Sequence, residues 1–179
     1  MFHVFNLLKI FGDRVDRDPL TQIYNRKYFY EALPRVRSLR TEKGTSIMML
    51  DIDNFKSIND NWGHLVGDRV ILAVVDIIKD SIRDNDIFAR LGGEEFGLLL
   101  PDTDGKQAIA VAERIRQNVQ QRTGPGYHYA LPVRVTLSIG VCSAIQNNVN
   151  GNDIMRDVDE ALYEAKHNGK NRIVTRQAE

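Results

Sequence analysis

Two glycines between two short apolar runs constrain the fold of this chain more than any other feature. The runs, residues 86–91 and 94–100, each have the length of a strand, and Gly92 and Gly93 separate them. This spacing predicts a tight β-hairpin, in which the glycines supply the positive φ angles of a primed turn. The middle of the chain therefore contributes an antiparallel strand pair to a sheet.

Helical and extended patterns alternate along the rest of the chain. Apolar spacing predicts helices over 25–42, 64–82, around 108–119 and over 154–165, the last one ending at Gly169 in a left-handed cap. Runs rich in apolar and β-branched residues predict strands at 47–50, 133–142 and 172–175. The expected fold is α+β, an α/β sandwich with helices flanking a central, mostly antiparallel sheet.

Length and charge limit the number of domains and the class of partner. The 179 residues favour one domain over 17–179, preceded by a helical linker over 1–16. Lys and Arg number 24 and Asp and Glu also number 24, which argues against a basic groove for a nucleic-acid polymer but not against a small nucleotide. We expect no membrane span, because no run of about 18 apolar residues occurs. The single cysteine, Cys142, favours a reducing cytoplasm.

The first sixteen residues carry a short apolar seam. Val4, Leu8, Phe11 and Val15 follow a 4-3-4 spacing that is typical of a heptad repeat. Two interpretations stay open: an amphipathic helix that lies on another surface, or a signalling helix that pairs with a second copy. A break is expected at Asp18, because the residue before a proline is disfavoured in a helix.

Acidic residues follow the strand predicted at 47–50 and the predicted hairpin turn. Asp51 and Asp53 are two residues apart, so both should lie on one face of a strand. Glu94 and Glu95 should face opposite ways, so that only one of them joins Asp51. Carboxylates from two neighbouring strand ends would suit Mg²⁺, which prefers oxygen ligands. The alternative is a pair of solvated turns.

Several segments together resemble the GGDEF-domain diguanylate cyclases of bacteria. Residues 92–96 read GGEEF, a variant of the motif that names the family, and the resemblance runs in order from about 17 to 175. Gln22 and Ile23 depart from it, because the family motif continues with Gly and Leu after Thr21. The other matching segments are DPLT at 18–21, NR at 25–26, LDIDNFK at 50–56, IND at 58–60, GH at 63–64, GD at 67–68, SIGV at 138–141 and ALYEAK at 161–166.

The resemblance implies a nucleotide-cyclase, palm-like fold and the condensation of two GTP molecules into cyclic di-GMP, with release of pyrophosphate. It implies Mg²⁺ as the cofactor, with Mn²⁺ as a substitute. The metal ligands would be the side chains of Asp51 and Glu94 and the backbone carbonyl of Ile52. Glu94 would also accept the proton of the 3′-hydroxyl, and Glu95 would hold a second metal or orient the site.

The resemblance also assigns residues to GTP. The backbone amides of Asn54, Phe55 and Lys56 and the Lys56 side chain would hold the terminal phosphates. The resemblance also implies that Lys166 and Lys170 bind the phosphates. Asn59 and Asp68 would bind guanine, and His64 would lie close to the nucleotide. Lys170 stands where many relatives carry Arg, so it lacks the two-pronged contact that a guanidinium offers. From its position alone, His64 is more often a capping or packing residue than a ligand.

A second site follows from an R-x-x-D pair six residues before the glycines. In the family, this spacing marks a site where cyclic di-GMP inhibits the enzyme. Arg83 and Asp86 would form it together with Arg114. From the residues alone, an exposed ion pair is the simpler interpretation.

The implied assembly is a homodimer, because each domain supplies one GTP half-site. Two other functions stay open: a catalytically silent module that senses cyclic di-GMP or GTP, and a cyclase that joins GTP to ATP. The acidic residue at position 68 counts against the second, because adenine lacks the N1–H and the 2-amino group of guanine that this carboxylate would accept from.

Overall fold

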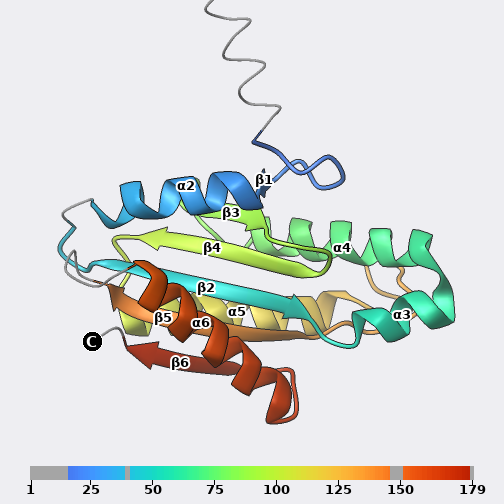
Figure 1. The fold of residues 1–179 in the computed structure, drawn as a ribbon. Coiled ribbons are helices and arrows are strands. Elements are labelled where there is room, and N and C mark those ends of the chain that lie inside the picture. The colour runs from blue at the N-terminus through green and yellow to red at the C-terminus, as the bar shows by residue number, and fades with distance from the viewer. Residues whose placement is uncertain (1–15, 39–40, 146–150, 178–179) are drawn as a thin grey trace, which may run out of the picture.

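One six-stranded sheet forms the centre of the part of the molecule that the structure describes (Figure 1). The computed structural model describes residues 16–38, 41–145 and 151–177. Across the sheet, the strand order is β1-β3-β4-β2-β5-β6. The strands are β1 (Tyr24–Asn25), β2 (Thr45–Ile52), β3 (Ile87–Arg90), β4 (Glu95–Pro101), β5 (Leu137–Ile145) and β6 (Ile173–Gln177).

Strand direction changes between the centre of the sheet and its edges. The three inner pairs, β3 with β4, β4 with β2 and β2 with β5, are antiparallel. The edge strands β1 and β6 pair in parallel with β3 and β5. The expected hairpin and the mostly antiparallel sheet are therefore confirmed.

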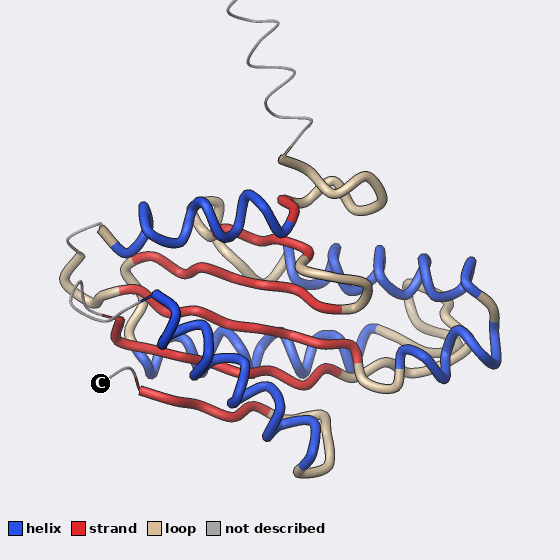
Figure 2. Tube along the Cα trace, viewed as in Figure 1, coloured by secondary structure: helices blue, strands red, loops and turns tan. Residues whose placement is uncertain are grey.

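Helices cover both faces of the sheet. The tube view shows α2 (Arg26–Arg37) and α6 (Gly151–His167) on the near face, with α4 (His64–Lys79) and α5 (Gly105–Arg122) behind (Figure 2). The short α3 (Phe55–Trp62) links β2 to α4 at one end of the sheet. Within the described part, no helix combines the length and apolar character that crossing a bilayer requires.

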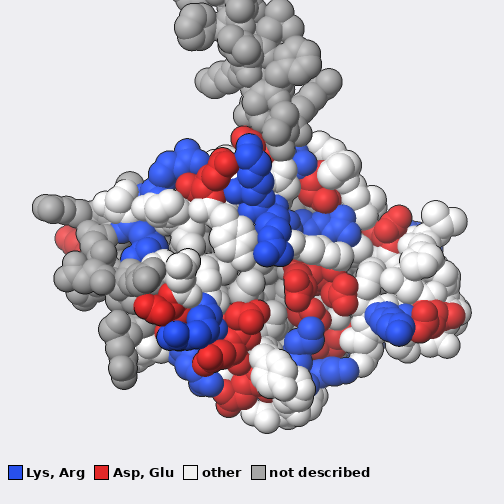
Figure 3. All heavy atoms as spheres, in the orientation of Figure 1, with Lys and Arg blue, Asp and Glu red and all other residues white. Residues whose placement is uncertain are grey.

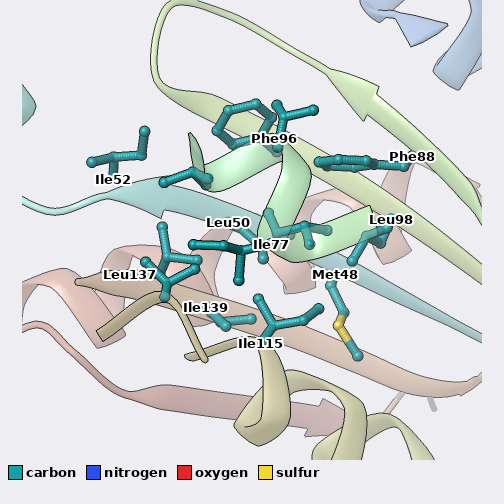
Figure 4. Close-up of a cluster of buried hydrophobic side chains, with 14 of the residues drawn as sticks. Met48, Leu50, Ile52, Ile77, Phe88, Phe96, Leu98, Ile115, Leu137 and Ile139 are labelled. Atoms are coloured by element: carbon teal, nitrogen blue, oxygen red, sulfur yellow. The ribbon is translucent and has the colours of Figure 1, made fainter. Parts of the chain in front are cut away.

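The alternation of side chains along β2 divides the core between the two faces. Met48, Leu50 and Ile52 are fully buried and belong to the larger cluster, which includes residues of α4 and α5 (Figure 4). Ile47 belongs to the smaller cluster, beneath α2 and α6. β2 is thus buried on both sides, which explains its nearly continuous apolar sequence.

The near-face helix α6 lies directly on β5 at Gly140. A Cβ atom at this glycine would lie 2.5 Å from the Leu162 nitrogen and from the Val158 carbonyl oxygen. Only glycine permits so close an approach of the two backbones. The contact holds α6 close to the sheet, and α6 carries Lys166.

The structure corrects three expectations about local structure. Gly92 and Gly93 do not adopt the left-handed φ of a primed turn. The turn is longer than two residues, because the Leu91 N–H donates to the Glu95 carbonyl (2.8 Å). The helix predicted over 25–42 ends at Arg37, where the Ser38 N–H caps the carbonyl of Pro34 (3.1 Å).

The strand predicted over 133–142 begins only at Leu137. The Val135 N–H donates to the Thr123 hydroxyl (3.0 Å) instead of to a neighbouring strand. Gly169 does take a left-handed φ after α6, as predicted. The helix predicted over 1–16 lies outside the described residues except for its last position.

Candidate active site

Three elements bring the predicted acidic and basic residues to one end of the sheet (Figure 1). These elements are the end of β2, the β3–β4 turn and the last turn of α6. Asp51 lies opposite Glu95 in the β2–β4 register, so these two side chains share a face. The Ile52 N–H donates to the Glu94 carbonyl (3.2 Å) and fixes the turn against β2.

Asp51 is a buried carboxylate among other acids. It is only 3% exposed, and its Oδ2 accepts from Lys166 Nζ at 2.7 Å. Burial raises the pKa of Asp51 to about 6. The negative charges of Glu94 and Glu95 also raise this pKa, whereas the hydrogen bond and the charge of Lys166 lower it. The charges of both glutamates act on Asp51, and Glu95 is the one that lies opposite it in the β2–β4 register.

Acidic atoms gather over the end of β2 and the β3–β4 turn, with basic atoms on both sides (Figure 3). No group of three or more His, Cys, Asp or Glu side chains in the described ranges is arranged to hold a metal ion. The expected ligand set needs only two carboxylates and the Ile52 carbonyl, and Lys166 already supplies a cation there. Hard oxygen donors around an excess of negative charge fit Mg²⁺.

Asp53 has a different environment from that of Asp51. It is 4% exposed and accepts from the Thr136 hydroxyl (2.7 Å), the Ser138 hydroxyl (2.6 Å) and the Asn171 N–H (2.9 Å). These donors satisfy both carboxylate oxygens. Asp53 therefore joins the end of β2 to β5 and to the α6–β6 connection.

The turn after β2 places the backbone amides of residues 54–56 at the N-terminus of α3. Asn54 has a φ of 58° and makes no side-chain cap, and its Oδ1 accepts from Lys170 Nζ (2.5 Å). The Phe55 side chain packs in the core, so only its amide can contact a ligand. Lys56 is exposed. Amides at a helix start and two lysines suit a phosphate group.

The expected base-binding residues lie on α3 and α4. Asn59 Oδ1 is buried and has no hydrogen-bond partner among the described residues. A Cβ atom at Gly67 would clash with that oxygen, so the absence of a side chain there leaves room for the amide. Asp68 and His64 are exposed on α4. The amide and the carboxylate are thus available to a ligand.

A second charged cluster lies where α4 leads into β3. The Arg83 N–H donates to Asp86 Oδ2 (2.8 Å), and Arg114 donates to the Ser81 carbonyl (2.6 and 3.2 Å). Burial raises the pKa of Asp86, and the Arg83 N–H and the charges of Arg83 and Arg114 counteract the rise. The structure therefore brings together the three residues predicted for the product site.

Sequence reasoning missed the arginine that holds the GGEEF turn. Arg90 donates to the carbonyls of Gly92 (3.2 Å) and Gly93 (2.8 Å) and forms an ion pair with Asp18 (3.1 Å). No spacing rule would have joined positions 18 and 90. Asp18 also accepts from the N–H and hydroxyl of Thr21, and Gln22, where the family has Gly, takes a φ of 59°.

Comparison with known proteins agrees with this arrangement. The family model described as diguanylate cyclase, GGDEF domain, matches residues 15–172. The probable diguanylate cyclase DgcT of Escherichia coli (strain K12) is 50% identical over 177 residues, which cover 98% of this chain and 39% of that protein. Diguanylate cyclase A of Treponema denticola is 42% identical over 161 residues, which cover 87% of this chain and 43% of that protein. The chain thus spans about two fifths of the length of these relatives.

Crystal structures show the same architecture. The coiled coil and GGDEF domain of DgcB from Caulobacter crescentus, in complex with c-di-GMP, superposes with a TM-score of 0.87 at 29% identity and covers 97% of this chain and 92% of that one. Diguanylate cyclase SiaD from Pseudomonas aeruginosa, in complex with its activator SiaC, gives 0.83 at 34% identity, with 97% and 66% covered. The family model matches most of the chain, and a relative is 50% identical to it over 177 residues. The chain therefore belongs to the GGDEF-domain family of diguanylate cyclases.

Proposed function

We propose that the chain condenses two GTP molecules into cyclic di-GMP and releases two pyrophosphates. The observation that carries the proposal is the buried Asp51 beside Glu94 and Glu95, with Lys166 as the only cation in hydrogen-bond contact with it in the described part of the chain. One lysine does not balance three carboxylates, and a metal ion bound with the triphosphate would supply further positive charge. The names of the relatives support the same reaction.

The residues around Asp51 would bind two parts of the substrate complex, the metal ion and the phosphates. Asp51, Glu94 and the Ile52 carbonyl would hold Mg²⁺ or Mn²⁺. When bound, the ion acts as a Lewis acid on the phosphates and lowers the pKa of the attacking hydroxyl. Lys166 and Lys170 would neutralise the terminal phosphates, and the amides at the start of α3 would donate to them.

The reaction makes one phosphoester bond in each direction between the two nucleotides. The 3′-oxygen of one GTP bonds to the α-phosphorus of the other, the bond to pyrophosphate breaks, and Glu94 accepts the hydroxyl proton. Glu95 lies opposite Asp51 and orients the acidic group or binds a second ion. Positioning and charge carry a transfer of this kind.

Recognition of guanine falls to Asn59 and Asp68. The Asp68 carboxylate would accept from guanine N1–H and the exocyclic amine, and Asn59 brings an amide oxygen that lacks a partner in the described structure. His64 begins α4 within the same helix pair and would lie close to the nucleotide. These assignments predict GTP in preference to ATP.

A homodimer would complete the reaction, because one domain holds one GTP. A twofold arrangement presents each 3′-hydroxyl to the opposite α-phosphate. We expect the cytoplasm as the compartment, where GTP is available.

The product, cyclic di-GMP, would bind at Arg83, Asp86 and Arg114 and inhibit the enzyme. The Arg83 guanidinium makes no hydrogen bond or ion pair with the part of the chain that the structure describes, so it is available to a phosphate. The alternative function, a silent module that senses cyclic di-GMP or GTP, would use these same sites without turnover. The intact Asp51 and Glu94 favour the enzyme.

Chromatography of the nucleotides after incubation with GTP and Mg²⁺ tests the proposal. The expected products are cyclic di-GMP and pyrophosphate in a ratio of one to two, with none from ATP alone and no mixed product. Product added beforehand should slow the reaction, and Arg83→Ala should remove that inhibition. Tight binding of GTP or cyclic di-GMP without any product would establish the sensor instead.

A further inference from the structure

The loop that carries Lys170 is held from outside the site. We propose that Arg116 of α5, acting through Asn171, positions this loop against Asp53 and so sets the place of Lys170 at the nucleotide. Arg116 is a positioning residue in this proposal, since it contacts no substrate. The inference rests on the proposed function, because that function gives Lys170 its role.

The loop needs support because its backbone is strained. Gly169, Lys170 and Asn171 have φ values of 113°, 62° and 45°, so three consecutive residues lie in the left-handed region. Glycine and asparagine tolerate this region, but lysine does not favour it. A strained conformation persists only where surrounding contacts determine it.

Asp53 holds the loop from the side of the sheet. The Asn171 N–H donates to Asp53 Oδ2 at 2.9 Å, and the hydroxyls of Thr136 and Ser138 fix the same carboxylate. Asp53 lies between Ile52, whose carbonyl is a proposed ligand, and Asn54, which begins the phosphate turn. One buried carboxylate therefore joins the two segments that would surround the triphosphate.

Arg116 holds the loop from the side of α5. Its Nη1 donates to Asn171 Oδ1 at 2.7 Å, and its Nε and Nη2 donate to the two oxygens of Glu113 at 2.9 and 2.7 Å. The two-pronged pair with Glu113 fixes the plane of the guanidinium, so its third nitrogen is aimed at the loop. The Arg116 side chain is only 17% exposed, which limits competition from water.

The contacts of Asn171 with Asp53 and Arg116 together determine the position of Lys170. With the loop fixed, Lys170 Nζ reaches Asn54 Oδ1 across the mouth of the proposed phosphate site. Without the contact from Arg116, the strained loop would sample other conformations, and Lys170 would spend less time near the phosphates. The expected consequence is weaker GTP binding with little change in the chemical step.

Two substitutions remove the contact in independent ways. Arg116→Met keeps the length of the side chain and removes every donor. Asn171→Gly removes the Oδ1 acceptor and leaves only the longer contact of Arg116 Nη1 with the Asn171 carbonyl (3.5 Å). It keeps a residue that tolerates positive φ and its N–H to Asp53. Arg122→Met is the matched control, because Arg122 lies on the same helix and pairs with Asp80 instead of the loop.

The experiment measures steady-state kinetics with GTP and the binding of 3′-deoxy-GTP with Mg²⁺ by calorimetry, on variants whose melting temperatures are also recorded. Each of the two variants should raise KM and Kd about fivefold and change kcat less than about twofold. The double variant should resemble the single ones, because both remove one contact. If Arg116→Met does not fold, Asn171→Gly alone decides the result.

The outcomes separate this inference from the proposed function. Unchanged KM and Kd in folded Arg116→Met and Asn171→Gly, or the same rise in Arg122→Met, would overturn the positioning role. A wild-type protein that binds 3′-deoxy-GTP but makes no cyclic product would overturn the proposed function and leave the positioning role testable by Kd. A wild-type protein that binds no nucleotide would overturn both.

Discussion

The two carboxylates at the end of β2 are equally buried but have opposite surroundings. Asp51 is 3% exposed and Asp53 is 4% exposed, and one residue separates them. Asp53 accepts from two hydroxyls and a backbone N–H, whereas Asp51 accepts from one lysine and faces Glu94 and Glu95. The carboxylate of Asp53 has all its hydrogen-bond donors without a ligand, whereas Asp51 lies in an excess of negative charge.

On the proposed function, this difference separates an acid that stabilises the fold from an acid that binds the metal ion. A buried carboxylate with a full set of donors stabilises the fold, because removing it leaves those donors unpaired. A carboxylate held among other acids is destabilised until a cation binds. Burial alone would have given both residues the same role.

The largest expected effect is on the Asp51 side. Glu94→Gln removes one metal ligand and the proton acceptor together, so the rate of pyrophosphate release should fall about 1000-fold. The melting temperature should stay close to that of the wild type. Glu160→Gln, on the exposed side of α6, is the control and should keep full activity. Turnover of Glu94→Gln near the wild-type rate would remove Glu94 from the mechanism.

On the Asp53 side, the expected effect is on stability. Asp53→Ala leaves three buried or half-buried donors without an acceptor and should lower the free energy of unfolding by about 3 kcal/mol. Denaturant titration of the metal-free protein measures this quantity. Asp51→Ala is the matched comparison and should cost less than about 1 kcal/mol, because it also relieves repulsion. Equal losses for the two variants would break the comparison.

The pH dependence of stability should come from Asp51. Its pKa rises from 3.8 in the unfolded chain to about 6 in the fold, so the folded state binds the proton more tightly. The stability that Asp51 contributes is present below pH 3.8 and is lost as the pH rises through 6. Relative to Asp51→Asn, the metal-free wild type should therefore lose about 2 kcal/mol of unfolding free energy between pH 4.5 and 7.5. A constant difference between the two proteins over that range would contradict the raised pKa.

The smallest expected effect is at the loop that Asp53 holds. Lys170→Arg would give the loop the guanidinium that many relatives carry and a two-pronged contact with phosphate. We expect KM for GTP to fall about threefold, with kcat unchanged, in steady-state assays. Lys106→Arg, an exposed substitution at the start of α5, is the control. A higher KM in Lys170→Arg would mean that the loop cannot fit the larger group.

The sequence predicted the sheet, the helices and the acidic cluster, because each depends on local patterns. The apolar run of β2 and the helical spacing of α4 and α5 are properties of neighbouring residues. The roles of Asp51 and Asp53 could not be separated in this way, since Thr136, Ser138 and Asn171 come from distant segments. The turn at Gly92 was predicted wrongly because Arg90 and Asp18 determine it, and their contact spans 72 positions.

A crystal structure with Mg²⁺ and 3′-deoxy-GTP tests the central claim most directly, because this nucleotide cannot be turned over. We predict the ion between Asp51, Glu94 and the Ile52 carbonyl, the guanine between Asn59 and Asp68, and Lys166 moved from Asp51 to the phosphates. Asp53 should keep its three donors. A nucleotide bound elsewhere, or an ion that Asp53 holds while Lys166 stays on Asp51, would contradict the assignment of the active site.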